Sequence, residues 1–260
     1  MDKLNFTPYA DVNAILSELL SNIQSILGPH LIAFYLDGSL AHGDFDEASD
    51  IDFVAVTNEP VSPQQFEALR LMHAQMNVGS SRWAAQLEGS YVWAQALQRY
   101  NPAHPPHPNI ERGLGERLKW EPQGPWWLPH LAIVREKGIV LLGPPPHTLI
   151  EPVSPDELRK TIRGVLNDYA GKYLNHPEEI RTRGSQSYLV LTVCRILYTL
   201  QHGSIASKKV AMGWAQTTLG EAWSGLIERA WLGRQQPDAG LHPGDREQTL
   251  QMIEYACTHG

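Results

Sequence analysis

The sequence predicts an α+β fold, in which an N-terminal domain of strands and helices precedes an all-α C-terminal helical bundle. Two apolar runs with aromatic members, Leu31–Leu36 and Phe53–Val56, are typical of buried strands. Apolar residues at helical spacing recur through the C-terminal part of the chain. Prolines cluster between residues 143 and 155. We therefore expect two domains, residues 1–150 and residues 151–260.

The first elements follow from apolar spacing and from residues that start or stop helices. Residues 8–28 carry apolar side chains at the spacing of a helix that packs on a sheet. Asp11 is expected to cap its start, and Gly28–Pro29 is expected to end it. The strand Leu31–Leu36 comes next. A further helix is expected over residues 63–77, with its apolar side chains on one face.

A glycine turn and two acids between the first two strands carry the clearest functional signal. Gly38 and Ser39 would offer backbone N–H groups and a hydroxyl to nucleotide phosphates. Asp50 and Asp52 point to the same face of a strand, about 7 Å apart, because side chains alternate. A divalent cation would relieve this like-charge pair, and oxygen ligands of this kind suit magnesium. A surface hairpin with solvated aspartates is the alternative to a nucleotidyl-transfer site.

The middle of the chain combines a third expected strand with a segment rich in proline and histidine. Ala84–Leu87 is predicted to enter the third strand, with Glu88 near its far end. Residues 101–109 contain two histidines, but the prolines impose extended backbone, so we expect a rim loop rather than a metal site. Three tryptophans between residues 120 and 127 could stack on a sugar, pack against a cation or lie in the core.

The rest of the chain has a helical pattern. Ser154, followed by a proline and two acids, predicts the start of a helix. The apolar positions then repeat with helical spacing, as expected for helices that share one core. The amphipathic stretches are Leu158–Tyr173, Ser187–Gln201, Lys208–Leu219, Glu221–Leu232 and Arg246–Cys257.

Composition and charge narrow the classes of partner. A net charge of −7 disfavours binding to nucleic acid, whereas a basic small molecule would be attracted. The cysteines, Cys194 and Cys257, suggest neither a disulfide framework nor a zinc cluster. The sequence shows no signal-peptide pattern and no apolar run of membrane-spanning length. We expect a cytoplasmic monomer with no nucleic-acid or membrane partner.

The segment GSLAHGDFDEASDID, residues 38–52, resembles the GS-x(n)-SD-x-D signature of the DNA polymerase β-like nucleotidyltransferase superfamily. Residues 135–146, 194–215 and 228–233 resemble the streptomycin/spectinomycin adenylyltransferases, in the same order along the chain. The resemblance covers most of the chain, apart from a segment near residues 95–125. It implies a mixed-sheet nucleotidyltransferase domain followed by a helical bundle. It also implies transfer of AMP from ATP, with magnesium, to a hydroxyl of an aminoglycoside-like molecule, with release of pyrophosphate.

The resemblance implies roles for residues of the first domain. Ser39 and Ser49 would hold magnesium–ATP together with the acid pair. In the family the third strand supplies another carboxylate, which accepts the proton of the acceptor hydroxyl. Glu88 is the only acid from residue 68 to residue 110, so it is the candidate for this base and for a third metal ligand. The alternative is an exposed glutamate beside a Gly-Ser turn.

Three residues of the helical domain match family positions near the nucleotide. Arg195 and Lys208 match residues that contact its phosphates, and Trp231 stands where the family commonly has a tyrosine. Lys209 competes with Lys208, because this chain has two lysines where the family has one. The alternatives are a structural ion pair for Arg195, a solvated helix start for Lys208 and core packing for Trp231.

The acceptor is where the resemblance weakens. In the family, acids just before the helix that carries the arginine matching Arg195 bind cationic groups of the drug. The aligned positions here hold Arg181 and Ser185. Glu178 and Glu179 lie close by in the sequence. The expected partners are therefore ATP and a small molecule with an acceptor hydroxyl, which is either cationic or uncharged. A nucleotidyltransferase that adenylylates a protein, like the antitoxin relatives, and a catalytically silent nucleotide-binding module are the alternative functions.

Overall fold

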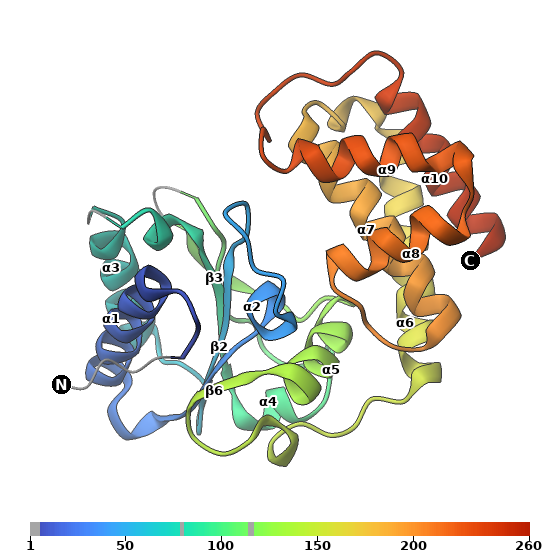
Figure 1. The fold of residues 1–260 in the computed structure, drawn as a ribbon. Helices are drawn as coiled ribbons and strands as arrows, with labels where there is room; N and C mark the ends of the chain where they lie inside the picture. Colours follow the sequence, from blue (N-terminus) through green and yellow to red (C-terminus); the bar gives the residue numbers. More distant parts are fainter. Residues whose placement is uncertain (1–5, 79–80, 114–116) are drawn as a thin grey trace. The chain divides into compact units, whose positions relative to one another are not determined.

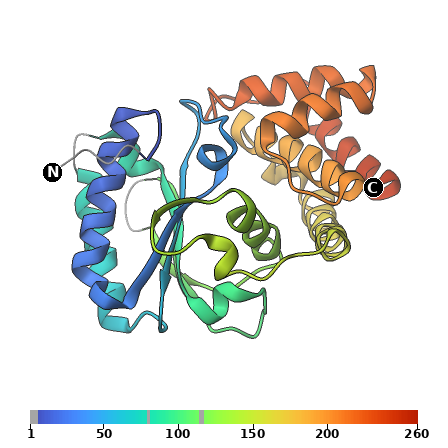
Figure 2. The ribbon, with the colours of Figure 1, turned by 60° about the horizontal axis from the view of Figure 1, so that its bottom comes forward.

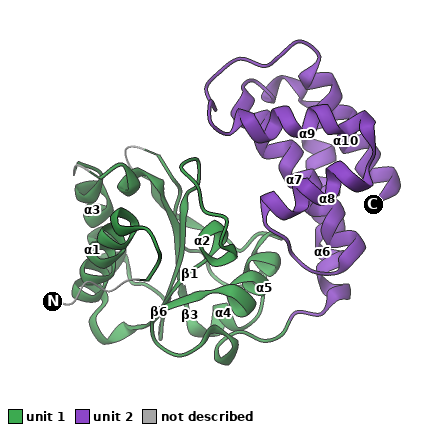
Figure 3. Cartoon of the chain, viewed as in Figure 1, with its two compact units in different colours: residues 1–152 green, residues 153–260 purple. Residues whose placement is uncertain are grey.

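The computed structural model describes residues 6–78, 81–113 and 117–260, and the chain divides into two compact units (Figure 3). Unit 1 comprises residues 1–152 and unit 2 comprises residues 153–260. Unit 1 holds a sheet covered by helices, and unit 2 is built from helices. The predicted α+β class is therefore confirmed.

A six-stranded mixed sheet forms the centre of unit 1. Its strands lie in the order β5-β4-β3-β2-β1-β6, with β2 and β3 parallel and the other neighbours antiparallel. Strand β1 coincides with the predicted run, whereas β2 begins before its predicted start because Ile51 and Asp52 already pair with β3. The strands are β1 (Leu31–Leu36), β2 (Ile51–Thr57), β3 (Leu87–Trp93), β4 (His107–Ile110), β5 (Leu118–Glu121) and β6 (Ile139–Leu142).

Helices cover both faces of this sheet (Figures 1 and 2). Helices α1 and α3 pack on the face that buries Phe34, Phe53 and Tyr91, and α4 and α5 pack on the face that buries Tyr35 and Val54. The short helix α2 directly follows β1 at the glycine turn. The helices of unit 1 are α1 (Ala10–Leu27), α2 (Gly38–His42), α3 (Pro63–Val78), α4 (Ala94–Gln98) and α5 (Trp127–Lys137), with short 3-10 turns η1 (Gly28–His30), η2 (Arg82–Gln86) and η3 (Pro146–Thr148).

Unit 2 contains the helices that the sequence pattern predicts (Figure 1). The first begins with the predicted cap, since Ser154 Oγ accepts from the Glu157 N–H and the Glu157 carboxylate accepts from the Ser154 N–H. In the part of the chain that the structure describes, no helix is both long and apolar enough to span a bilayer. The helices are α6 (Pro155–Asn175), α7 (Arg183–His202), α8 (Lys208–Thr218), α9 (Glu221–Gly233) and α10 (Asp245–His259), with the 3-10 turn η4 (Pro177–Glu179).

Two predicted element ends were wrong. Residues 82–86 form the 3-10 turn η2, so β3 starts at Leu87 and Glu88 lies near its beginning, not at its far end. Trp83 and Ala84 of this turn are buried, which explains why the segment resembled the start of a strand. Helix α1 starts at Ala10, so Asp11 lies inside the first turn. Its negative charge there interacts favourably with the helix dipole, but its side chain does not cap the helix.

The segment rich in proline and histidine is only partly a loop. Residues 101–106 are irregular, but His107 opens strand β4, so the predicted loop was wrong for its last three residues. His107 is buried, and its ring centroid lies 4.9 Å from that of Trp127. Burial, and then the nearby charge of His130, lower the pKa of His107 to about 4. This histidine is therefore a neutral core residue at neutral pH.

A buried arginine ties the start of β3 to the segments around it. Arg117 is 7% exposed and donates to the carbonyl oxygens of Ala84, Leu87 and Glu111 at 3.1, 3.1 and 2.9 Å. It also donates to Oδ1 of Asn77 at 2.9 Å. Burial lowers the pKa of Arg117 from its usual value. Because Leu87 directly precedes the acid of β3, this guanidinium sets the backbone from which that acid projects.

Replacing Arg117 with Met should lower the free energy of unfolding by about 2–4 kcal/mol, because several buried acceptors lose their donor. Arg117→Lys keeps the charge but has fewer donors, so it should fall between Met and the wild type. Urea unfolding followed by circular dichroism measures the change. Arg82→Met is the control, since the Arg82 side chain is 58% exposed. Equal unfolding free energies for Arg117→Met and Arg82→Met would contradict this account.

Candidate active site

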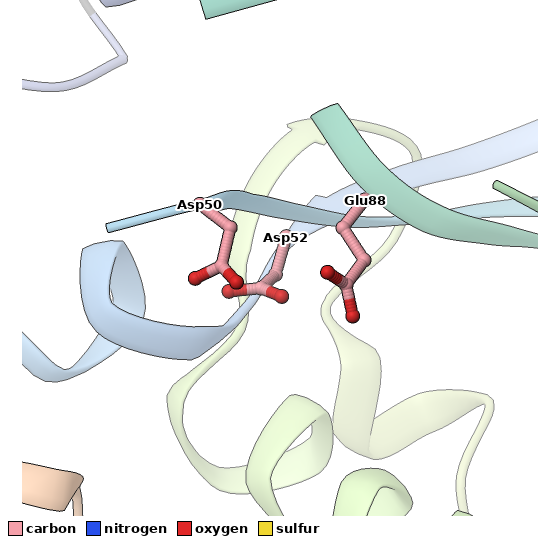
Figure 4. Close-up of side chains that lie close together, drawn as sticks. All are labelled: Asp50, Asp52 and Glu88. Atoms are coloured by element: carbon pink, nitrogen blue, oxygen red, sulfur yellow. The ribbon is translucent and has the colours of Figure 1, made fainter. Parts of the chain in front are cut away.

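Three carboxylates from two adjacent strands converge on one side of the sheet (Figure 4). In the parallel β2–β3 pair, Asp52 and Glu88 are register partners, so their side chains project from the same face. Asp50 stands two residues before Asp52 and points to that face as well. One oxygen from each of the three carboxylates lies within 4.8 Å of the others. The structure therefore brings together the three acids that the sequence analysis selected.

This acid cluster, defined as Asp50, Asp52 and Glu88, has the composition of a site for a hard cation. All three residues are partly buried, so their mutual repulsion is less screened than at an open surface. Nη1 of Arg112 approaches Oδ2 of Asp50 at 3.6 Å, but the Arg112 side chain is 54% exposed. An ion pair this exposed offsets little of the repulsion. Oxygen donors of this kind and number fit magnesium.

The glycine turn is shaped around the cluster. Gly38 adopts φ +58°, and a Cβ placed on it would overlap the carboxylate of Asp52. The N–H of the preceding residue, Asp37, donates to the carbonyl of Asp52 at 3.0 Å. Glycine is therefore required at residue 38 both for the left-handed backbone and for the space that Asp52 occupies.

The serines selected from the sequence have different environments. Ser39 lies in α2, and its shielded Oγ has no hydrogen-bond partner among the described residues. A buried hydroxyl without a partner is costly, which suits a group that awaits a ligand oxygen. Ser49 instead donates from Oγ to Asp46 Oδ1 at 2.9 Å and accepts from the Asp46 N–H at 3.0 Å. Its hydroxyl is thus engaged in the loop that leads into Asp50.

The pairing of a buried aspartate with a histidine beside the turn was not recognised from the sequence. Oδ2 of Asp37 lies 2.8 Å from Nδ1 of His130, and the Asp37 side chain is 3% exposed. The pair joins α5 to the residue directly before Gly38. The available signal was an aspartate at the end of a buried strand, which needs a partner. That partner lies far along the chain, so sequence alone could not identify it.

The other predicted nucleotide residues belong to unit 2. Nε of Arg195 donates to the carbonyl of Ala206 at 3.1 Å, which ties α7 to the turn before Lys208, the first residue of α8. Lys208 is partly buried, whereas Lys209 is exposed. Trp231 is partly buried, and the guanidinium carbon of Arg234 lies 4.3 Å from its ring centroid.

The acids near the start of α7 already have basic partners. Glu178 lies 3.4 Å from Nδ1 of His176, and Glu179 lies 3.0 Å from Nζ of Lys172. The carboxyl pKa of Glu178 is lowered from its usual value, first by a hydrogen bond from its own backbone and then by one from the His176 side chain. Ser185 accepts from the Arg181 N–H and completes the cap of α7. At Arg181 and Ser185, where the resemblance aligns acids of the family, unit 2 therefore presents an arginine and a capping serine.

Sequence comparisons match both parts of the chain to known families. Residues 16–80 match a nucleotidyltransferase domain, and residues 148–259 match the C-terminal domain of aminoglycoside adenylyltransferases. The chain is 26% identical over 226 residues to a spectinomycin 9-adenylyltransferase of Staphylococcus aureus, covering 83% of this chain and 82% of the relative. It is 27% identical over 263 residues to an aminoglycoside (3'') (9) adenylyltransferase of Escherichia coli, covering 96% of each.

A solved structure has the same fold. It is a spectinomycin adenyltransferase from Enterococcus faecialis, crystallised with ATP and spectinomycin. The TM-score is 0.69 and the sequence identity 18%, with 94% of this chain and 96% of that chain covered. At this identity the likeness establishes the fold alone.

Gly38→Ala should weaken binding of Mn²⁺, a spectroscopic substitute for magnesium, by about 10–100-fold, because the new methyl group displaces Asp52. Gly43→Ala is the matched control: Gly43 has φ +75° at the other end of α2, and a Cβ there meets nothing within 4 Å. Both changes carry a similar backbone strain of about 1–2 kcal/mol. Electron paramagnetic resonance titration with Mn²⁺ measures the affinities, and equal values for the two variants would contradict the steric argument.

Proposed function

We propose that this chain, an adenylyltransferase-like member of the nucleotidyltransferase superfamily related to the aminoglycoside adenylyltransferases, is a magnesium-dependent O-adenylyltransferase. It transfers AMP from ATP to a hydroxyl of an aminoglycoside-like small molecule and releases pyrophosphate. The convergence of Asp50, Asp52 and Glu88 beside the Gly38 turn carries this proposal. The ATP in the crystal structure of the same fold supports the choice of nucleotide.

Metal and nucleotide binding follow from the acid cluster and the turn. Asp50, Asp52 and Glu88 would hold the magnesium ion, which when bound neutralises charge on the triphosphate. The backbone N–H groups after Gly38 would bind phosphate oxygens, as would the Ser39 hydroxyl, which has no hydrogen-bond partner within the described part of the chain. Ser49 acts on the site through its loop, by setting the position of Asp50.

Three residues of unit 2 are also assigned to the nucleotide. Arg195 and Lys208 are assigned to the triphosphate, because each is a partly buried cation at a position that matches the family. The hydrogen bond from Arg195 to Ala206 orders the turn before Lys208. Trp231 is assigned to the neighbourhood of the nucleotide, where its ring can stack.

The transfer step uses Glu88 as the proton acceptor. The acceptor oxygen forms a bond to the α-phosphorus while the bond from that phosphorus to the pyrophosphate oxygen breaks. The hydroxyl proton passes to the Glu88 carboxylate, and the electron pair of the broken bond leaves on pyrophosphate. Positioning and electrostatic stabilisation supply most of the acceleration in such reactions.

The test is an incubation with magnesium, ATP labelled on the α-phosphate and a panel of aminoglycosides. Labelled small-molecule product together with pyrophosphate is the expected result. Label on protein would support the protein-adenylylating alternative instead. Bound nucleotide without product or pyrophosphate would support a silent nucleotide-binding module.

Glu88→Gln should lower kcat by about 10²–10⁴-fold, because the base is lost while the neutral side chain keeps its shape. ATP affinity should change much less than kcat, since Asp50, Asp52 and the glycine turn remain to hold magnesium and the phosphates. Steady-state kinetics and nucleotide titration measure both quantities. Glu111→Gln is the control, because Glu111 is an exposed acid in the same unit. An undiminished kcat for Glu88→Gln would refute the assignment.

Streptomycin should be a poor acceptor, because the positions that carry drug-binding acids in the family hold Arg181 and Ser185 here. An arginine repels a cationic drug, and the hydroxyl of Ser185 is used by the α7 cap. Turnover of streptomycin is compared with turnover of the other panel members at equal concentration. Robust adenylylation of both streptomycin and spectinomycin would show that these acids are dispensable.

A further inference from the structure

A row of polar side chains extends from the acid cluster across the next two strands. Ser90 follows Glu88 by one pleat on β3 and projects from the same face. Its hydroxyl donates to Oδ1 of Asn109, its register partner on β4, at 2.7 Å. Nδ2 of Asn109 donates to Oε2 of Glu121 on β5 at 3.2 Å. We call Ser90, Asn109 and Glu121 the polar row.

The row is held in one orientation. Ser90 is 4% exposed, and its hydroxyl directs the amide of Asn109 so that the NH₂ group faces Glu121. Asn109 and Glu121 are both partly buried. Glu121 lies opposite His107, so strand rise and spacing put its Cα roughly 16 Å from that of Glu88, and its side chain reaches back toward Asn109. One acceptor of two or three rings can span that distance.

The Glu121 carboxylate accepts a hydrogen bond from the Asn109 amide. Among the residues that the structure describes, no lysine, arginine or histidine forms an ion pair with it. Lys119 projects from the same face but is exposed. The side chain between them, Trp120, points to the other face, where its ring centroid lies 4.9 Å from that of Phe66. This packing keeps Glu121 directed to the face of the acid cluster.

We propose that Glu121 and Asn109 form an acceptor subsite that takes a protonated amine of the hydroxyl compound, with Ser90 as the residue that positions Asn109. This inference rests on the proposed adenylyl transfer, in which the reacting hydroxyl lies at Glu88. A partly desolvated carboxylate attracts a cation more strongly than one in open water. The acceptor is therefore an amino-bearing polyol, recognised by an acid of unit 1 rather than at Arg181 or Ser185.

The experiment compares Glu121→Gln with wild type, using the panel aminoglycoside that is turned over best and the same compound after N-acetylation. Glutamine retains an oxygen for the Asn109 amide, so the variant removes charge and leaves the hydrogen bond. We expect the acceptor KM to rise about 10–30-fold for the amine. The KM for ATP, kcat and the thermal unfolding midpoint should stay near wild type. For the acetylated compound, wild type and variant should have the same KM.

Two further variants make the outcome specific. Asn109→Ala should raise the acceptor KM in the same direction, since it frees Glu121 from its tether. Glu178→Gln, an exposed acid of unit 2 already paired with His176, should leave it unchanged. An unchanged acceptor KM for Glu121→Gln, an equal rise for the acetylated compound, or efficient use of only neutral or anionic acceptors would overturn the subsite while adenylyl transfer stands. Absence of product with every acceptor would instead refute the proposed function, and with it this subsite.

Discussion

The parallel pairing of β2 with β3 is the constraint on which the candidate site depends. It sets Asp52 beside Glu88 in register, and neighbouring strands are only about 4.8 Å apart. The two carboxylates therefore cannot move away from each other without breaking the ladder. A slip of one residue would turn Glu88 to the face that packs against α1 and α3, where a carboxylate has no place. The sheet thus imposes the charge crowding that makes a cation favourable.

Buried polar groups hold this register and the turn beside it. Arg117 binds the carbonyl groups on both sides of the β3 start, and Asp37 binds His130 just before Gly38. Each group is shielded from water, so breaking its contacts would leave unsatisfied partners. The candidate catalytic groups are partly buried side chains on backbone segments that adjoin these contacts.

One face of the sheet serves both as core and as site. At their C-terminal ends, β2 and β3 present Val54, Val56 and Val92 to helices α4 and α5. At their N-terminal ends the same face presents Asp52 and Glu88, near the polar row that runs from β3 to β4 and β5. The side chains on this face therefore change from apolar to polar along the two strands. An acceptor subsite on this face would also explain how the chain can lack acids at the aligned positions of unit 2.

The sequence by itself determined the strands β1 and β2, the glycine turn, the helices of unit 2 and the membership of Asp50, Asp52 and Glu88 in one candidate site. All of these except Glu88 follow from local periodicity, cap residues and a motif whose members lie close together along the chain. Glu88 was selected because the family resemblance implies a third carboxylate on the next strand. Only the tertiary structure decided the parallel register, the 3-10 turn that moves Glu88 to the start of β3, the strand within the proline- and histidine-rich segment, and the partners of Asp37 and Glu121. Those features join residues far apart in the chain, and local spacing carries no information about which distant group will satisfy a buried charge.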